Sequence, residues 1–216
     1  MVGVGPEGAE SSLARVSIVN FHGAVVLDTF VKQKEKVVDY RTWVSGVTIA
    51  DLIGAPTFEE VQKQVADLIK EKVLVGHAIQ NDFSALLLSH PRPLVRDTQT
   101  CPALRLAGGG SKHPGLKKLA LVELGVEIQS GRHSSVVDAR ATMALYRLHK
   151  DAWEPTFAHL KAGKRKMGEG GFPGGGRRGV SSGLGMVPVG EGKKAKGGKG
   201  AAVEESAEDG SNWWDE

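Results

Sequence analysis

The stretch Val73-Leu74-Val75-Gly76-His77-Ala78-Ile79-Gln80-Asn81-Asp82 decides the fold class of this chain. Its apolar start predicts a short buried strand, and the apolar positions at 83–87 predict a helix directly after it. A helix is also expected before the strand, because Thr57 and Glu60 form a capping-box pattern ahead of an apolar helical face. A strand that follows a helix in this way is typical of parallel pairing, so the sequence predicts an α/β fold.

The residues before this unit predict a β-hairpin. Apolar and polar residues alternate over 14–18, residues 20–23 favour a turn, and residues 24–31 return as a second strand. Two strands alone are not stable, so the hairpin needs a third strand or a helix. Residues 3–12, rich in Gly, Ser and Glu, predict a loop.

The residues after this unit predict one more short strand, at 94–97, and two helices. The first of these helices ends at Gly125, a residue suited to a left-handed C-cap. Ser134 or Ser135 is expected to cap the second, longer helix. The side chains expected to point inward from the longer helix are Val137, Ala141, Leu145 and Leu148.

The composition changes after about Leu160. More than half of the chain's 29 glycines lie beyond this point, together with basic runs and an acidic end that carries Trp213 and Trp214. Such a segment buries too little apolar surface to offset its ordering entropy, so we expect a folded domain over 1–160 and a disordered tail over 161–216. The basic runs indicate either a solubilising tail or a segment for nuclear targeting or weak RNA contact.

Composition excludes some classes of protein. The chain has 216 residues, enough for one domain with a tail, and its net charge of +3 permits an anionic partner. Cys101 is its sole cysteine, so no intrachain disulfide is expected. Runs of about 18 apolar residues and the pattern of a signal peptide are both missing from the sequence, so neither a membrane span nor a secretory leader is expected.

Three polar residues are candidates for chemistry. Asp82 lies near a helix start, where an N-cap role is the structural alternative, and Asp138 lies in a first helical turn, where the helix dipole favours an acidic residue. His133, just before that helix, could equally be a surface histidine. Together they suit metal-assisted hydrolysis, because Mg²⁺ prefers carboxylate and phosphate oxygens and a histidine can take the proton of an attacking water.

Several separate motifs in the correct order extend this pattern. The chain resembles the DEDDh 3′–5′ exonucleases, in their RNA exonuclease 4 and interferon-stimulated exonuclease group, over about residues 1–154. The stretches that carry the resemblance are Met1-Val2-Gly3-Val4-Gly5-Pro6, Ala14-Arg15-Val16-Ser17-Ile18-Val19-Asn20, Asp39-Tyr40-Arg41-Thr42 with Ser45-Gly46, Val75-Gly76-His77 with Asn81-Asp82-Phe83, Arg96-Asp97-Thr98, and His133-Ser134-Ser135 with Asp138-Ala139.

The resemblance implies an RNase H-like fold, in which helices flank a mixed five-stranded sheet. It implies that Asp82 and Asp138 are the second and third acidic motifs, that His133 is the general base, and that Arg41 and Met1 lie near the terminal nucleotide of the substrate. The implied reaction is stepwise hydrolysis of single-stranded RNA from its 3′ end with Mg²⁺ or Mn²⁺, releasing nucleoside 5′-monophosphates. Ribosomal RNA processing in the nucleus or nucleolus is the expected setting, with no membrane and with protein partners unknown.

The chain departs from the family pattern at its start. In the family an Asp-Cys-Glu motif, at the end of a central strand, precedes the run that matches Met1-Val2-Gly3. We therefore expect this chain to lack two of four metal-binding carboxylates and to be nearly inactive, with the two-ion site present only in a full-length form. An internal methionine taken as the start of the coding sequence, or a short isoform, would explain the departure.

The missing strand also affects the expected sheet. It belongs between the strand at Ala14 and the strand at Val73, so we expect either a strand rearrangement or two facing edges with unpaired backbone groups. We expect a cleft beside Met1, with Asp82 and Asp138 facing it. The alternative functions are a catalytically dead RNA-binding or regulatory protein of the same fold and a scaffold that acts through the tail.

Overall fold

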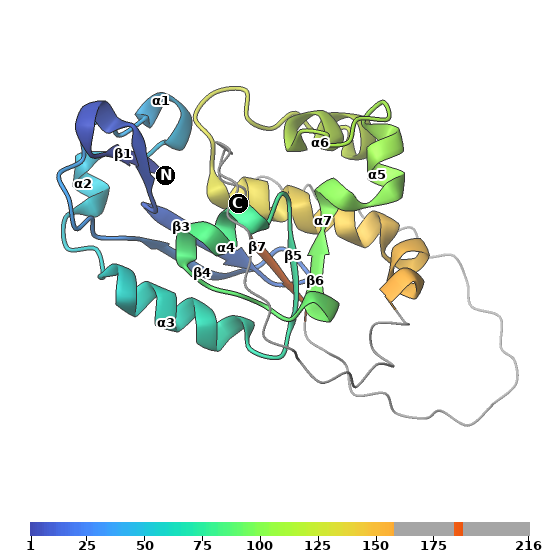
Figure 1. Cartoon of the computed structure of the whole chain (residues 1–216). Helices are drawn as coiled ribbons and strands as arrows, with labels where there is room; N and C mark the ends of the chain where they lie inside the picture. Colours follow the sequence, from blue (N-terminus) through green and yellow to red (C-terminus); the bar gives the residue numbers. More distant parts are fainter. Residues whose placement is uncertain (158–183, 188–216) are drawn as a thin grey trace, which may run out of the picture.

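Two pairs of strands lie on either side of a short central strand in the main sheet of the computed structural model, which describes residues 1–157 and 184–187 (Figure 1). The strand order is β4-β3-β7-β5-β6. The bounds are β3 (Arg15–Val19), β4 (Val25–Phe30), β5 (Val73–Gly76), β6 (Val95–Asp97) and β7 (Leu184–Val187). The mixed α/β fold expected from the sequence is confirmed.

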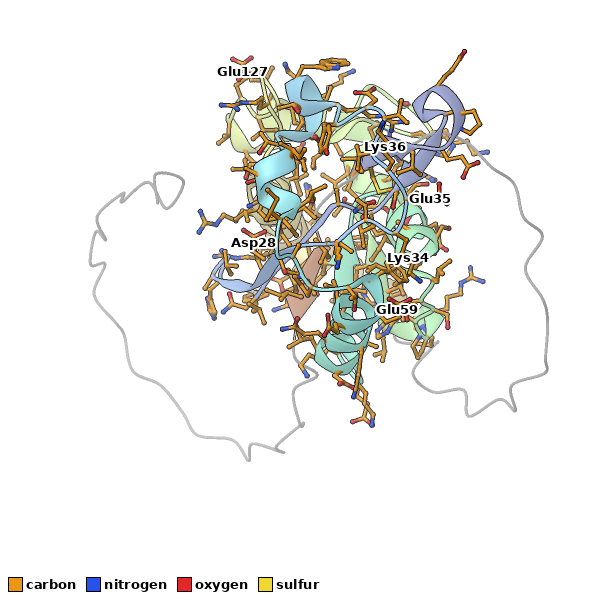
Figure 2. All side chains as sticks on the ribbon, turned by 90° about the vertical axis from the view of Figure 1, so that its left-hand side faces the viewer. Asp28, Lys34, Glu35, Lys36, Glu59 and Glu127 are labelled. Carbon is orange, nitrogen blue, oxygen red and sulfur yellow. The ribbon has the colours of Figure 1, made fainter. Side chains whose placement is uncertain are left out.

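The outer pairs form as their sequences predict. β3 and β4 are an antiparallel hairpin, in which Asn20 Oδ1 accepts hydrogen bonds from the backbone N–H groups of His22 and Ala24 in the turn. β5 and β6 pair in parallel. The helix expected before β5 is α3 (Phe58–Ile69), and Thr57 and Glu60 form its capping box. Figure 2 shows Lys34, after β4, beside Glu59 at the start of α3, and these two side chains form an ion pair.

Helices cover both faces of the sheet. Strand side chains alternate between faces, so Ile18 and Leu74 join the apolar cluster of α3, whereas Val19 and Val75 join that of α7 (Ser135–Trp153) on the other face. α6 (Leu116–Leu124) packs against α7 and ends at Gly125 in the left-handed conformation, as expected. α5 (Pro102–Ala107) lies beside α6 (Figure 1). Leu148, expected to point inward, is exposed because it lies on the solvent side of α7.

A buried ion pair fixes the end of α7 to β6. The guanidinium of Arg96, which is fully buried, donates to both carboxylate oxygens of Glu154 at 2.6 and 3.0 Å and lies over the ring of Phe157. Tyr146 Oη donates to the same carboxylate at 2.9 Å. The short 3₁₀ turns of the chain are η1 (Pro6–Gly8), η2 (Arg92–Leu94), η3 (Thr98–Thr100) and η4 (Glu154–Phe157).

The first residues form a second, small sheet rather than the loop expected from their composition. β1 (Val2–Val4) pairs antiparallel with β2 (Glu10–Ser12). Apolar packing stabilises this sheet, because Val2 is fully buried and packs with Ala14 and Val47 in a separate apolar cluster. Two one-turn helices follow β4, and their bounds are α1 (Thr42–Ser45) and α2 (Ile49–Leu52).

β7 is the main departure from the expected fold. Residues 184–187 belong to the segment expected to be a disordered tail, yet they lie between β3 and β5, parallel to β3 and antiparallel to β5. Both neighbouring strands carry backbone groups that need partners, and β7 pairs with both, so the two facing edges are not left open. The other residues expected in the tail, Trp213 and Trp214 among them, lie outside the described residues.

Candidate active site

Asp82 is positioned by the turn between β5 and α4 (Gln80–Leu86). Ala78 takes the left-handed conformation in this turn, with φ of 56°, and its N–H donates to Asp97 Oδ1 at 2.9 Å. Asp82 is the third residue of α4 and Ile79 is its N-cap, so the structure does not give Asp82 the capping role that was its alternative. The Asp82 carboxylate therefore does not cap α4, and a role in binding remains open to it.

The environment of Asp82 disfavours its charged form. Burial raises the pKa of this carboxyl well above its ordinary value, and the negative charge of Asp97 raises the pKa further. Asp82 Oδ2 is enclosed and has no hydrogen-bond partner among the described residues. A buried carboxylate oxygen without a donor is costly, and a bound cation would remove that cost.

Asp138 lies in the first turn of α7 and is 1% exposed. Gln129 Nε2 donates to its Oδ1 at 2.9 Å, while its Oδ2 is buried without a hydrogen-bond partner in the described part of the chain. Burial raises the pKa of Asp138 to about 6, although the hydrogen bond from Gln129 acts to lower it. Asp138 therefore repeats the main property of Asp82, one enclosed carboxylate oxygen without a partner.

His133 lies two residues before α7, and its backbone N–H donates to the Val44 carbonyl of α1 at 2.7 Å. Partial burial lowers the pKa of its imidazole, and the positive charge of Lys117 lowers the pKa further. The ring is therefore neutral near neutral pH, which is the state that a general base requires.

Arg41 and Met1 lie on the same side of the molecule as Asp82. The Arg41 guanidinium donates to Ser11 Oγ at 2.9 Å and to the Gly8 carbonyl at 3.1 Å. Burial and the charge of Arg41 lower the pKa of the Met1 amino group, and the charge of Asp82 acts in the opposite direction. The structure therefore brings the Met1 amino group within electrostatic reach of both Arg41 and Asp82.

The strand registers place both carboxylates at one end of the sheet. Gly185 of β7 pairs with Val19 on one side and with Val75 on the other, so Ser17 of β3 lies at the end where β5 leads toward Asp82. The hydroxyl oxygens of Ser17 and Ser135 lie 2.6 Å apart, which fixes the start of α7 at the same end. In Figure 1 the start of α7, α4 and the N-terminus project onto the same region. A shared pocket for Asp82 and Asp138 stays a prediction.

The chemistry of the two carboxylates fits a hard divalent cation, because each offers an oxygen that no donor within the described ranges satisfies. The fit is limited to these two side chains. Groups of three or more His, Cys, Asp or Glu side chains that could hold a metal ion are absent from residues 1–157 and 184–187.

Sequence reasoning gave no role to Gln129 and Asp97, the two residues that contact the site from outside it. Gln129 lies in a loop without periodicity, where no pattern could identify it. Asp97 ends β6, which pairs with β5, the strand that leads to Asp82. Its place at the end of a neighbouring strand could have predicted that it lies close to Asp82.

No helix within the described residues has the length and apolarity to cross a membrane.

Comparisons with known proteins show which family and which solved structures the chain is similar to. Residues 1–146 match the family model RNase_T, described as Exonuclease. The chain is 51% identical over 229 residues to RNA exonuclease 4 of Cryptococcus neoformans var. neoformans serotype D, covering 87% of this chain and 56% of the relative. It is 60% identical over 167 residues to RNA exonuclease 4 of Mycosarcoma maydis, covering 76% and 44%. The chain thus spans about half the length of these curated relatives.

Solved structures share the fold. The pseudoubiquitin hydrolase–RNA exonuclease module of Saccharomyces cerevisiae Pan2, in complex with AAGGAA RNA, matches with a TM-score of 0.61 and 29% identity, over 74% of this chain and 29% of that one. The Neurospora crassa Pan2 catalytic unit matches with a TM-score of 0.58 and 27% identity, over 72% and 27%. The RNase H-like architecture expected from the sequence is therefore confirmed.

Proposed function

We propose, from the premise that this chain belongs to the DEDDh exonuclease family in its RNA exonuclease 4 group, that its activity is stepwise hydrolysis of single-stranded RNA from the 3′ end, impaired here because the Asp-Cys-Glu motif is absent from the sequence. The observation that carries the proposal is the pair of enclosed, unpartnered oxygens on Asp82 and Asp138, at one end of the sheet. The RNA bound to the Pan2 exonuclease module and the name of the curated relatives support RNA as the substrate.

Each side chain has a proposed role in the reaction. Asp82 and Asp138 would hold divalent cations, Mg²⁺ or Mn²⁺, which when bound polarise the phosphodiester and lower the pKa of an attacking water. His133, with its lowered pKa, accepts the proton of that water. Met1, whose amino group lies within electrostatic reach of Arg41 and Asp82, would contact the terminal nucleotide together with Arg41. The products would be nucleoside 5′-monophosphates.

The cellular setting is part of the proposal. We place the protein in the nucleus or nucleolus, acting on ribosomal RNA precursors. The basic runs after residue 160 and the group to which the chain belongs support this placement. Localisation of the tagged full chain by fluorescence, and its exclusion from the nucleus after the basic runs are neutralised, would test it.

A 5′-labelled single-stranded RNA tests the activity, because stepwise removal from the 3′ end produces a ladder. We expect a weak Mg²⁺-dependent ladder, visible at high enzyme concentration, from the natural chain and from the Asp67→Asn control, whose carboxylate is exposed on α3, and none from Asp138→Asn. In a second readout, Mg²⁺ should raise the unfolding temperature of the natural chain and of the control but not that of Asp138→Asn. Equal ladders from all chains would overturn the proposal.

A second candidate function is RNA binding without hydrolysis. It is favoured by one observation: the described residues bring together no group of three or more side chains that could hold a metal ion. If the natural chain and Asp138→Asn both degrade RNA at equal, negligible rates but bind it in a salt-sensitive manner, this second function is the correct one.

A further inference from the structure

Trp43 exposes a large aromatic side chain next to the candidate active site. It lies in the one-turn helix α1 and is 78% exposed. Its exposure leaves the face of the indole available for stacking, although exposure alone is common among apolar side chains of this chain. Neither the fold nor the proposed reaction uses this side chain.

The turn that carries Trp43 is well fixed. Thr42 Oγ1 donates to the Val47 carbonyl at 2.6 Å, and Ser45 Oγ donates to the Tyr40 carbonyl at 2.8 Å. Gly46, with φ of 69°, ends the turn in the left-handed conformation. These bonds fix the backbone on both sides of Trp43, so its indole would meet a ligand from a pre-ordered platform.

Backbone contacts attach the same turn to the segment that carries His133. The His133 N–H donates to the Val44 carbonyl at 2.7 Å, one residue after Trp43. A Cβ at Gly46 would lie 3.4 Å from the His133 carbonyl oxygen and 4.0 Å from Arg132 Cβ, which are ordinary contact distances, so the turn packs directly against this segment. Trp43 is therefore on an element that directly touches the proposed general base.

The charge around this junction suits a polyanion. Arg132 is exposed beside Gly46, and Lys117 lies close enough to His133 to lower the pKa of its imidazole. Two acidic groups lie nearby. Asp39 accepts a hydrogen bond from the Arg41 N–H and lies 3.8 Å from the Arg41 guanidinium, and Glu127 lies 3.9 Å from the ammonium group of Lys117, in an exposed pair that an RNA phosphate can replace. An aromatic plane flanked by cations is the arrangement that binds single-stranded nucleic acid, with bases stacked and phosphates paired.

We propose that Trp43 stacks on a base of single-stranded RNA, close to the 3′ end, in a subsite that adjoins His133. This inference rests on the proposed function and adds to it a binding subsite that acts on the base and not on the scissile phosphate. Exposed Ile53, at the end of α2, serves as the matched control, because it is apolar and 77% exposed but outside α1. Stacking on an aromatic side chain tolerates any base, so the subsite favours single strands without selecting a sequence.

Fluorescence anisotropy with a 5′-labelled single-stranded RNA in EDTA measures binding without hydrolysis. Loss of one stacked base corresponds to roughly a 5- to 100-fold weaker affinity, so we expect Trp43→Ala to fall in that range. Trp43→Phe should bind within about 3-fold of the natural chain, because its ring can also stack. Ile53→Ala should bind as the natural chain does. Circular dichroism of each variant checks that the fold is kept.

A set of RNAs with one abasic nucleotide at successive positions from the 3′ end locates the contact. At the position whose base stacks on the indole, the abasic RNA should bind the natural chain more weakly than the intact RNA does. Trp43→Ala should bind the intact and the abasic RNA equally, because this variant has already lost the stacking contact. Unchanged affinity of Trp43→Ala overturns the subsite, as does equal weakening by Ile53→Ala, which would mean that the loss is not specific to the indole. The proposed function fails separately, if Asp138→Asn hydrolyses RNA as the natural chain does.

Discussion

Asp82 and Asp138 reach the same end of the sheet by two different routes. Asp82 follows strand β5, through a turn that Asp97 stabilises by a hydrogen bond. The negative charge of Asp97 also makes the charged form of Asp82 less favourable. Asp138 lies on the long helix α7, and Gln129 from the preceding loop donates to it. One site is supported by backbone geometry and the other by a side-chain donor.

The difference shows which property the site needs. Different scaffolds hold the two carboxylates and different neighbours surround them, yet both keep one oxygen enclosed and without a partner among the described residues. Gln33 Oε1 and Thr142 Oγ1 are also buried without a partner in the described part of the chain, but the two aspartates offer carboxylate oxygens, and each unsatisfied buried acceptor costs roughly 1–3 kcal/mol. The common feature is therefore the one that a cation would use.

The largest effect is expected when the charge of either carboxylate is removed. Asp82→Asn and Asp138→Asn should each reduce the weak hydrolysis of RNA to background, because each removes the charge of a metal ligand that acts in the transition state. The double variant should be little worse than either single variant, since residues that act as a unit are not additive. Single-turnover rates on a 5′-labelled RNA measure this. Rate losses that multiply in the double variant would mean that the carboxylates act independently.

β7 pairs with β3 on one side and with β5 on the other, so disrupting β7 should destabilise both halves of the sheet. Gly185 pairs with Val19 and with Val75, and a proline there removes a backbone donor and forces φ. We expect Gly185→Pro to lower the free energy of unfolding by about 3 kcal/mol, measured by urea denaturation. Deletion of residues 189–216, which keeps β7, is the control and should change stability little. Equal stability of Gly185→Pro and the natural chain would show that the strand adds nothing to the fold.

Patterns of neighbouring residues were enough to predict most of the fold. The hairpin β3–β4, the capping box at Thr57, the parallel pair β5–β6 and the C-cap at Gly125 all follow from local rules that the structure confirms. β7 could not be predicted, because its four residues lie in a glycine-rich segment and pair with strands far away in the sequence. A strand of this kind is specified by the edges it meets and not by its own periodicity.

The candidate site was predictable in its residues but not in its environment. Asp82, Asp138 and His133 could be named from motif order, whereas the donor on Asp138 and the charge beside Asp82 depend on tertiary contacts. Burial of each carboxylate is likewise a property of the packed chain. The raised pKa values could therefore not be read from the sequence.

The pKa of Asp138 makes stability depend on pH. Its pKa rises from the ordinary 3.8 to about 6 in the folded chain, so the folded state binds more protons than the unfolded state between these values. The free energy of unfolding should fall as pH rises from 4 to 6, by up to about 3 kcal/mol, and level off above that.

Replacing the Asp138 carboxyl should remove its contribution to the dependence of the free energy of unfolding on pH. In urea titrations with EDTA, Asp138→Asn should be the more stable chain above pH 6 and should match the natural chain near pH 4. Asp67→Asn, on the exposed side of α3, should keep the natural slope. A natural slope in Asp138→Asn would place the titrating group elsewhere.

The smallest effect is expected at Asp97, which supports the Asp82 side alone. Its Oδ1 accepts from the N–H groups of Ala78 and Gln99, at 2.9 and 3.0 Å, and so holds the left-handed turn into α4. Asp97→Ala loses both bonds and should cost about 1–2 kcal/mol of stability, whereas Asp97→Asn keeps an acceptor and should recover most of it. Because the hydrogen bonds of Asp138 run to Gln129 and to the Ser134 carbonyl, hydrogen exchange at the Ala78 amide should speed up in Asp97→Ala while the Asp138 amide of α7 stays protected. If both amides lose protection together, the two routes to the site are one cooperative unit, and the contrast between them is not a property of the folded chain.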